Sequence, residues 1–520
     1  MSFEPSKSDP SKSSTPDPLL PIWEAIWERT PILKEIMEKH GNRSSLYEYT
    51  RGFLDINPMP ALDERRKEFI SIVEDLLKQR LNPTVAQEVA AQLAKYHVLS
   101  TTDHHGPITH PYWINSNIIS VLPYHELTDP VLKYMMVLSF ASVSLNNPSA
   151  YPRGIVFHGN NRGSEDFIRL PVLPDKEKMS VVYNARAFNK EDVFRAKEAL
   201  ARKVQEGLVL TKKAEGVKGL LDHFFLDEQV LAAPDLSTQI TIINYKLWPE
   251  LFKKEGTAVP NLIYLDIETV MTELLVKFHL NKPDSLLYKL LFDKKYQELA
   301  RQYFNGIPGA FDLQKDLGTY FFWGLDSKNH RIRFVLQDGK LVCPDGEHQY
   351  DYTPEEITKA LQMKKIFPSM MLCYVMAACY YGYKCLGGFS QVSDLTQTKQ
   401  AWMRLLKEVD EEAEARAIEP LQTKEMSGGG TVVSFLETQS GDLLPATGID
   451  MAVYDDKFAL DEFIQLSRQV TFYEMMNPMV VDIYKVLYTE VERDPEFLKW
   501  TPEAIMDYLD LKKRIPSGEM

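Results

Sequence analysis

The sequence has little cysteine and a deficit of positive charge. Its 520 residues include four cysteines, and none of them has the Cys-x-x-Cys spacing of a zinc site. So few cysteines cannot form a disulfide framework, which favours a reducing compartment, and we expect a cytoplasmic protein. The 59 basic and 73 acidic residues give a net charge of −14, which disfavours a general affinity for nucleic acid or anionic membranes.

Long hydrophobic runs are also scarce. The longest covers residues 368–383, PSMMLCYVMAACYYGY, and is shorter than the roughly 18 residues that a membrane span needs. Because its apolar residues occur on all faces of a helix, we interpret it as a buried core helix. A peripheral membrane helix is the alternative, since lysines flank the run. Residues 1–18 are rich in Ser, Pro and Lys and are typical of a disordered tail.

Hydrophobic patterning divides the rest of the chain into three regions. Residues 19–100 show helical periodicity and predict a helical N-terminal region. In residues 101–350, short β-branched runs alternate with helical patterns, which predicts a central mixed α/β sheet with an antiparallel hairpin insertion at residues 318–346. Residues 351–520 are mostly helical in pattern. We therefore predict an α/β or α+β fold, without deciding whether the regions are separate domains.

Five β-branched or apolar runs are expected to be strands of the central sheet. They are residues 134–145, 153–159, 179–188, 237–245 and 261–268. Ligands of such sheets bind beyond the carboxyl ends of the strands. We expect His158 and Asp266 to lie at such ends.

Histidines are concentrated in residues 101–111, TTDHHGPITHP, where three of the eleven histidines and one aspartate fall within eight positions. If this segment is extended, Asp103 and His105 share one face and His104 points away, while His110 returns after the Gly-Pro turn. Oxygen and nitrogen ligands of this kind suit zinc, manganese or iron. Asp103, His105 and His110 are therefore a candidate set for a divalent metal.

The same histidines are also candidates for acid/base chemistry. Imidazole titrates near neutral pH, so His104, His110 and His158 are possible catalytic groups. The alternative is structural, because histidines in packed loops commonly bond backbone carbonyl groups. The residues alone do not decide between these roles.

The string DHHGP at residues 103–107 resembles the EQHGP element of creatininase-type metal amidohydrolases. In that family a carboxylate and a histidine two residues further on bind metal, which implies Asp103 and His105 as ligands here. The resemblance covers five residues, and Ile114 stands where the family has a further carboxylate. It bears on local chemistry and not on the rest of the chain.

A second polar group occupies residues 144–163, SLNNPSAYPRGIVFHGNNRG. Arg153 and Arg162 are candidates to bind a carboxylate or phosphate. Asn160 and Asn161 are candidates to bind substrate through their side-chain amides. The alternative is a polar loop closed by asparagine turns. Two histidine-bearing turns are most simply explained as walls of one site, so we expect this loop to abut the histidine cluster.

Three further strings carry weaker signals. LIYLDIETV resembles the first motif of DEDD-type exonucleases, which implies Asp266 and Glu268 as metal ligands; a strand end followed by helix-starting acids is the alternative. The glycines of residues 428–430 predict a flexible loop or lid. The glycines of residues 387–388 are interpreted as the end of the buried helix.

These features favour an enzyme that acts on a small polar or anionic metabolite, with metal-dependent hydrolysis as the preferred reaction because metal-activated water needs few other groups. Two alternatives stay open: a non-catalytic binding or regulatory protein with structural histidines, and a DEDD-like nuclease. The expected partner is a small-molecule substrate, and neither nucleic acid nor a membrane is expected. The sequence does not set the oligomeric state.

Overall fold

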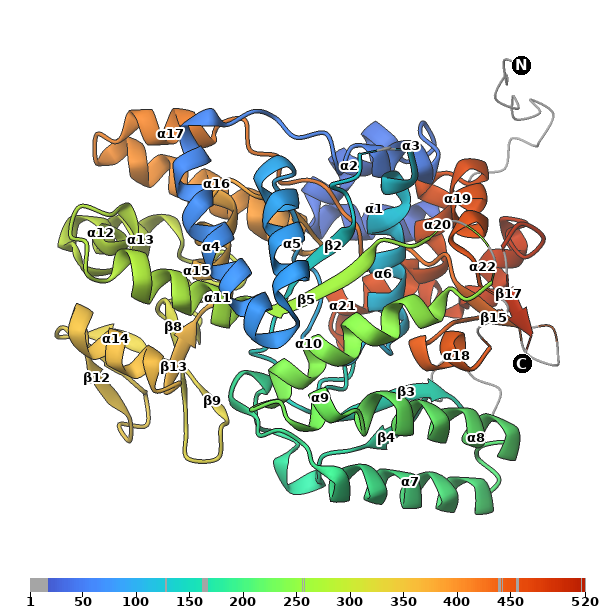
Figure 1. Ribbon diagram of the computed structural model, residues 1–520. Coiled ribbons are helices and arrows are strands. Elements are labelled where there is room, and N and C mark those ends of the chain that lie inside the picture. Colours follow the sequence, from blue (N-terminus) through green and yellow to red (C-terminus); the bar gives the residue numbers. More distant parts are fainter. Residues whose placement is uncertain are drawn as a thin grey trace.

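The computed structural model describes residues 17–126, 129–160, 167–254, 256, 258–437, 441, 443–454, 458–515 and 517–519. It is about 52% helical and contains a four-stranded parallel sheet, with helices towards both ends of the chain (Figure 1). The predicted α/β or α+β class is therefore confirmed.

Five helices precede the first strand, as the periodicity of residues 19–100 predicts. They are α1 (Leu20–Arg29), α2 (Pro31–His40), α3 (Leu46–Arg51), α4 (Asp63–Arg80) and α5 (Pro83–Lys95). Local sequence sets their ends. At the start of α5 the Asn82 side chain accepts a hydrogen bond from the Val85 amide, and Pro83 follows at the first helical position, where no amide donor is needed.

The parallel sheet lies at the centre of the molecule. Its strands, in spatial order, are β14 (Lys384–Leu386), β1 (Val98–Ser100), β2 (Tyr134–Ser139) and β5 (Asn261–Asp266). Strands β2 and β5 pair along six residues, from Tyr134 opposite Asn261 to Ser139 opposite Asp266. Figure 1 shows both strands between α5 and the helices α6 (Pro111–Val121) and α10 (Leu236–Leu247).

Both faces of this sheet are buried, which explains why its strands are continuous apolar runs. Along β2, Tyr134, Met136 and Leu138 enter one hydrophobic core, and Met135 and Val137 enter the other. Helices α4, α5, α11 (Ile267–Leu274) and α16 (Gln391–Glu408) contribute to the first core, and α6 and α10 contribute to the second.

The order of the strands creates a crevice at one edge of the sheet. The chain runs from β1 to β2 and on to β5, and then returns to place β14 on the opposite side of β1. The connections that leave β1 and β14 therefore diverge at their carboxyl ends. Open α/β sheets bind ligands at such a switch point.

The remaining elements surround the sheet. The hairpin of β3 (Gly154–His158) and β4 (Phe167–Pro171) is followed by α7 (Lys190–Gln205), α8 (Thr211–Leu220) and α9 (Glu228–Leu231). The antiparallel insertion predicted at residues 318–346 is confirmed by β8 (Phe322–Leu325), β9 (Arg331–Ile332), β10 (Val335–Gln337) and β11 (Lys340–Val342). Near it lie α12 (Leu286–Phe292), α13 (Lys294–Tyr303), β6 (Phe311–Asp312), β7 (Leu317–Gly318), β12 (Gln349–Asp351), α14 (Pro354–Gln362) and β13 (Ile366–Pro368).

The C-terminal part is mostly helical, as predicted. Its elements are α17 (Glu412–Ile418), β15 (Phe435–Glu437), β16 (Leu443–Pro445), α18 (Gly448–Val453), α19 (Leu460–Gln469), α20 (Phe472–Met476), α21 (Val480–Leu487), α22 (Pro502–Tyr508) and β17 (Ser517–Glu519).

Two of the five expected strands are wrong, and a third lies outside the main sheet. Residues 237–245 belong to α10, which Asp235 caps and which is buried around most of its circumference, so that no amphipathic period marks it. Residues 179–188 form no strand: they contain a short 3-10 turn at Val182–Asn184 and isolated bridges at Val181 and Arg186. His158 ends β3, which pairs with β4 alone, and not a strand of the parallel sheet.

The apolar run of residues 368–383 is buried, as expected. It forms α15 (Met370–Tyr374), which continues as a π-helix over Val375–Tyr380. The glycines of residues 387–388 do not end this helix, because the chain first turns at Gly382 and forms β14. Within the described ranges, no helix is long and apolar enough to cross a membrane.

Candidate active site

A cavity of about 450 Å³ occupies the switch point. Thr101 and Thr102, which follow β1, form one part of its wall, and Gly388 and Phe389, which follow β14, form another. Gly429 also lines it and has a positive φ of 79°; a Cβ atom there would approach the Gly388 Cα to 3.2 Å. The two glycine-rich strings therefore meet here because their backbones touch.

Two other cavities share lining residues with this one. One, of about 580 Å³, shares His104, Phe140 and Met370 with it. The other, of about 490 Å³, shares Tyr112 and Ser149, together with Met479 and Asp482. The three cavities are therefore neighbours; we call them together the groove, and we call the 450 Å³ cavity the switch-point cavity.

His104 is the histidine of the cluster that faces the switch-point cavity. The amide of Phe140 donates to the Asp103 carbonyl, and the amide of His105 donates to the Phe140 carbonyl, so that the strand pairing of β1 with β2 continues through this segment. The backbone is therefore extended, and alternate side chains point to opposite sides. His104 lines two parts of the groove, whereas Asp103 and His105 are fully buried.

Hydrogen bonds fix the tautomer of His104. Its Nδ1 lies 3.1 Å from the Asn147 Oδ1 and 3.1 Å from the Ser149 Oγ. The Asn147 atom is an oxygen, because it also accepts the backbone amides of Ser149 and Ala150. The Ser149 hydroxyl donates to this same oxygen, so both neighbours act as acceptors and Nδ1 carries the proton.

The Nε2 atom of His104 consequently carries a lone pair. It makes no hydrogen bond with any residue that the structure describes, and the ring lines the groove. Burial lowers the pKa of His104 below its usual 6.5, against the effect of Asn147, which raises it. A neutral imidazole with an open nitrogen is suited to accept a proton or to ligate a metal.

Asp103 and His105 share one face, as the extended pattern predicts, but they point into the core beneath the sheet edge. The Tyr264 hydroxyl donates to Asp103 Oδ2 at 2.8 Å, and the Tyr264 ring stacks on His105 at 5.6 Å between centroids. Burial raises the pKa of Asp103 to about 7, against hydrogen bonds from Asn117 and Tyr264. A tyrosine side chain thus contacts both residues that the resemblance implies as ligands.

Both ring nitrogens of His105 are already bonded. Nδ1 lies 2.7 Å from the Ser139 hydroxyl, and Nε2 lies 3.0 Å from the Ser237 hydroxyl. The Ser237 hydroxyl in turn donates to Asp266 Oδ1, which Arg80 pairs with at 2.7 Å. Burial lowers the pKa of His105 to about 4. His105 is therefore held as a neutral member of a closed, buried network.

His110 lies in a different part of the groove from His104. It precedes α6, where its Nδ1 accepts from the Tyr112 amide, and burial lowers its pKa to about 3. The proposed metal set of Asp103, His105 and His110 is not gathered around one point: in the described ranges, no three His, Cys, Asp or Glu side chains are placed to hold an ion together.

His158 lies close to His110, as expected for two walls of one region. Both rings contact the Phe167 ring, at 5.5 Å for His110 and 4.9 Å for His158. The Val156 amide donates to the Thr109 hydroxyl, so the described part of the loop does abut the histidine cluster. His158 Nε2, however, donates to the Pro445 carbonyl, and its side chain is buried.

The expected substrate-binding residues have structural partners where they are described. Arg153 pairs with Asp175 at 2.9 Å and is buried. Asn160 joins two loop segments by bonding the Gly207 carbonyl and the Leu210 amide. Asn161 and Arg162 lie outside the described residues.

The two acidic residues of the nuclease-like motif serve separate contacts. Asp266 pairs with Arg80, which holds the pKa of this carboxyl well below its usual range. Glu268 accepts the backbone amides of Ala141 and Ser142 at 2.8 and 2.9 Å, and burial raises its pKa to about 7. Each carboxyl group therefore has its own partner in the fold.

Two lining residues, Asp394 and Arg169, are not predicted from the sequence. Asp394 lies in the first turn of α16 and reaches the switch-point cavity, and Arg169 on β4 reaches the part that contains His110. Asn147 orients His104 from a loop that resembles an ordinary asparagine turn. Whether these side chains reach the groove depends on which strands are neighbours in the sheet.

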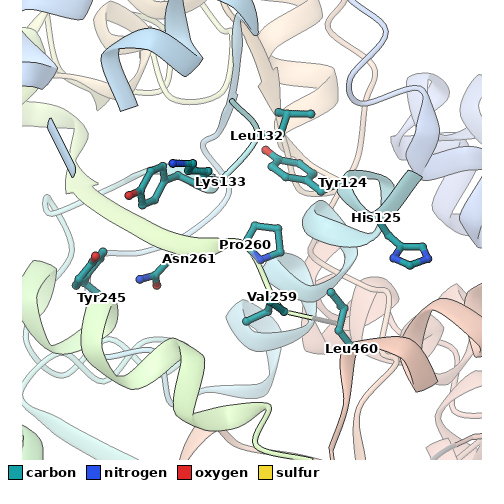
Figure 2. Close-up of a pocket in the computed structure, with 11 residues that line it drawn as sticks. Tyr124, His125, Leu132, Lys133, Tyr245, Val259, Pro260, Asn261 and Leu460 are labelled. Carbon is teal, nitrogen blue, oxygen red and sulfur yellow. The ribbon is translucent and has the colours of Figure 1, made fainter. Parts of the chain in front are cut away.

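Another pocket, of about 430 Å³, lies at the opposite edge of the sheet, where β2 and β5 begin. Figure 2 shows its labelled side chains, among them Lys133, Tyr245 and His125, spread around an open cleft without converging. Glu88 engages the Lys133 amine at 2.5 Å. This edge is not where α/β sheets bind ligands, so the groove at the carboxyl edge is the better candidate.

No protein-family model matches the chain, and a search of curated proteins finds no relative. The function is therefore argued from the groove itself.

Proposed function

We propose that the protein is an enzyme that acts on a small polar metabolite bound in the groove, with His104 Nε2 as the general base. One observation carries the proposal: a neutral imidazole, oriented through Nδ1 by Asn147, presents its lone pair to a cavity at the switch point of a parallel sheet. The cavity volume of about 450 Å³ fits a small ligand.

Hydrolysis is the reaction that this arrangement favours. His104 would take a proton from water as the water attacks the substrate, and would pass this proton to the leaving group as the scissile bond breaks; the Asn147 oxygen would stabilise the imidazolium between the two transfers. A divalent metal bound through the same lone pair is a second form of the proposal; Asp394, which lines the same cavity, would be a candidate second ligand, and water or substrate would complete the set. Arg169, which is exposed in the adjoining cavity, would hold an anionic end of the substrate.

The test compares His104→Gln with His125→Gln, a matched change at an exposed histidine in the opposite pocket. Purified protein is incubated with a metabolite extract, with and without added zinc or manganese, and mass spectrometry follows the compounds that disappear. We expect wild type and His125→Gln to consume the same compound, and His104→Gln to do so about 10²–10⁴-fold more slowly. Equal rates for the two variants, or binding without turnover by the wild type, would refute the proposal.

A further inference from the structure

One carboxyl group in the groove has no partner. The Asp394 side chain lines the switch-point cavity and is 8% exposed, and no hydrogen bond or ion pair joins it to another described residue. Burial alone raises its pKa to about 7. Asp266, also buried, has Arg80 beside it. A carboxylate in the position of Asp394 is stabilised by any cation that enters the cavity.

The charges around the switch-point cavity favour such a cation. Its lining includes two carboxyl groups, those of Asp394 and Asp482, and no lysine or arginine. Lys485 pairs with Asp482 at 3.5 Å and offsets its charge, so the preference for a cation depends on Asp394. His104 is neutral, so it does not offset the negative charge.

The start of α16 could by itself favour an anion, since its amides point towards the amino end of the helix. Asp394, however, is in the first turn of this helix and places a carboxylate there. A second anion would meet that carboxylate at close range in a poorly solvated space. The helix end therefore does not make the cavity a phosphate site.

The rest of the wall is largely aromatic and apolar. Five aromatic rings line the cavity, those of Tyr112, Trp113, Phe140, Tyr374 and Phe389, and Met370, Met479 and Ile483 join them. Aromatic faces attract organic cations and also cover apolar groups. A ligand that matches this wall carries its charge on an apolar body.

From these observations we propose that the switch-point cavity binds a primary amine or amidinium group attached to an apolar body, with the Asp394 carboxylate as its counter-ion. This inference rests on the proposed function and deepens it: the amine end of the substrate would lie in the switch-point cavity, and the anionic end proposed for Arg169 would lie in the adjoining cavity. The binding step itself does not depend on turnover. His104, on the wall of the same cavity, would then activate water for hydrolysis of a bond near the apolar body.

The test uses three probes of similar shape: benzylammonium, benzyl alcohol and benzoate. Calorimetric titration of the full chain measures the affinity of each for wild type, Asp394→Asn and Asp284→Asn, the last an exposed aspartate at a separate cavity. We expect benzylammonium to bind at least about tenfold more tightly than the other two, as a charge-assisted hydrogen bond implies. Asp394→Asn should remove this preference, and Asp284→Asn should keep it.

Carboxyl ¹³C NMR supplies a second readout, in which benzylammonium should lower the pKa of Asp394. If His104→Gln still binds benzylammonium but has lost turnover in the metabolite assay, both proposals are supported. If the wild type binds benzylammonium but turns over no compound, the proposed enzymatic function is refuted and the amine site is still supported. Benzoate that competes with benzylammonium for the same site, an unchanged preference in Asp394→Asn, or no binding of any probe would overturn the amine site.

Discussion

Replacing each of two adjacent histidines by alanine should give opposite results. His105→Ala removes a fully buried ring that stacks on Tyr264 and is bonded on both sides, to Ser139 and Ser237. Truncating a buried ring lowers the free energy of unfolding by about 3–5 kcal/mol, and this range includes the loss of the ring's hydrogen bonds. His104→Ala removes a half-buried ring at a cavity wall and should cost about 1 kcal/mol.

Urea unfolding, followed by tryptophan fluorescence, measures both costs, and the metabolite assay measures turnover. We expect His105→Ala to lower the unfolding midpoint strongly, and His104→Ala to lose turnover with a nearly unchanged midpoint. The metal hypothesis from the sequence predicts instead that His105→Ala leaves the fold intact. A His105→Ala protein as stable as wild type would refute the assignment of His105 to the buried network.

The pH dependence of stability, compared between wild type and His105→Ala, provides a further check. Burial lowers the pKa of His105 to about 4, whereas the unfolded chain binds this proton near pH 6.5. Acid therefore favours the unfolded wild type between these values, and His105→Ala lacks this contribution. The difference in free energy of unfolding between wild type and His105→Ala should therefore become smaller as the pH falls from about 6.5 to about 4.

Three other substitutions test the fold and the amine site by urea unfolding. Arg80→Met should destabilise the protein by about 3–5 kcal/mol, because it leaves Asp266 buried and unpaired; an unchanged midpoint would contradict the importance of this ion pair. Asp394→Asn should be more stable than wild type by about 1–3 kcal/mol above pH 7, because the raised pKa makes the ionised wild-type carboxyl costly there, and the gain should vanish towards pH 4. Met376→Asp should cost several kcal/mol because Met376 is fully buried, whereas Met179→Asp, at a residue 56% exposed, should cost little; equal effects would argue against the buried helix.

The sequence predicts the buried strands β2 and β5 correctly, because their apolar runs are bounded by polar residues. It does not predict β14, where Lys384 interrupts the apolar pattern. The Lys384 amine is satisfied by the Gly52 and Asp55 carbonyl groups, from a segment more than 300 residues away. No local pattern contains that information.

The candidate site was predictable to the same limited extent. Strand alternation predicts that His104 points away from Asp103 and His105. Which of the two faces borders a cavity depends on the placement of β14 beside β1, and this order is not readable from residues 101–111. Asp394 resembles an ordinary acid in the first turn of a helix, and only its burial beside a cavity makes it a candidate for binding.

The distance along the chain between β1 and β14 has a consequence for biosynthesis. Thr101 and Leu386, which bond to each other at the switch point, are 285 residues apart. While a ribosome makes the intervening chain, the edge of β1 that will receive β14 is open to pairing with other strands. Contacts of such long range also form slowly. The nascent protein therefore stays exposed to aggregation until β14 emerges and closes that edge, which makes it a candidate client for a chaperone that binds growing chains.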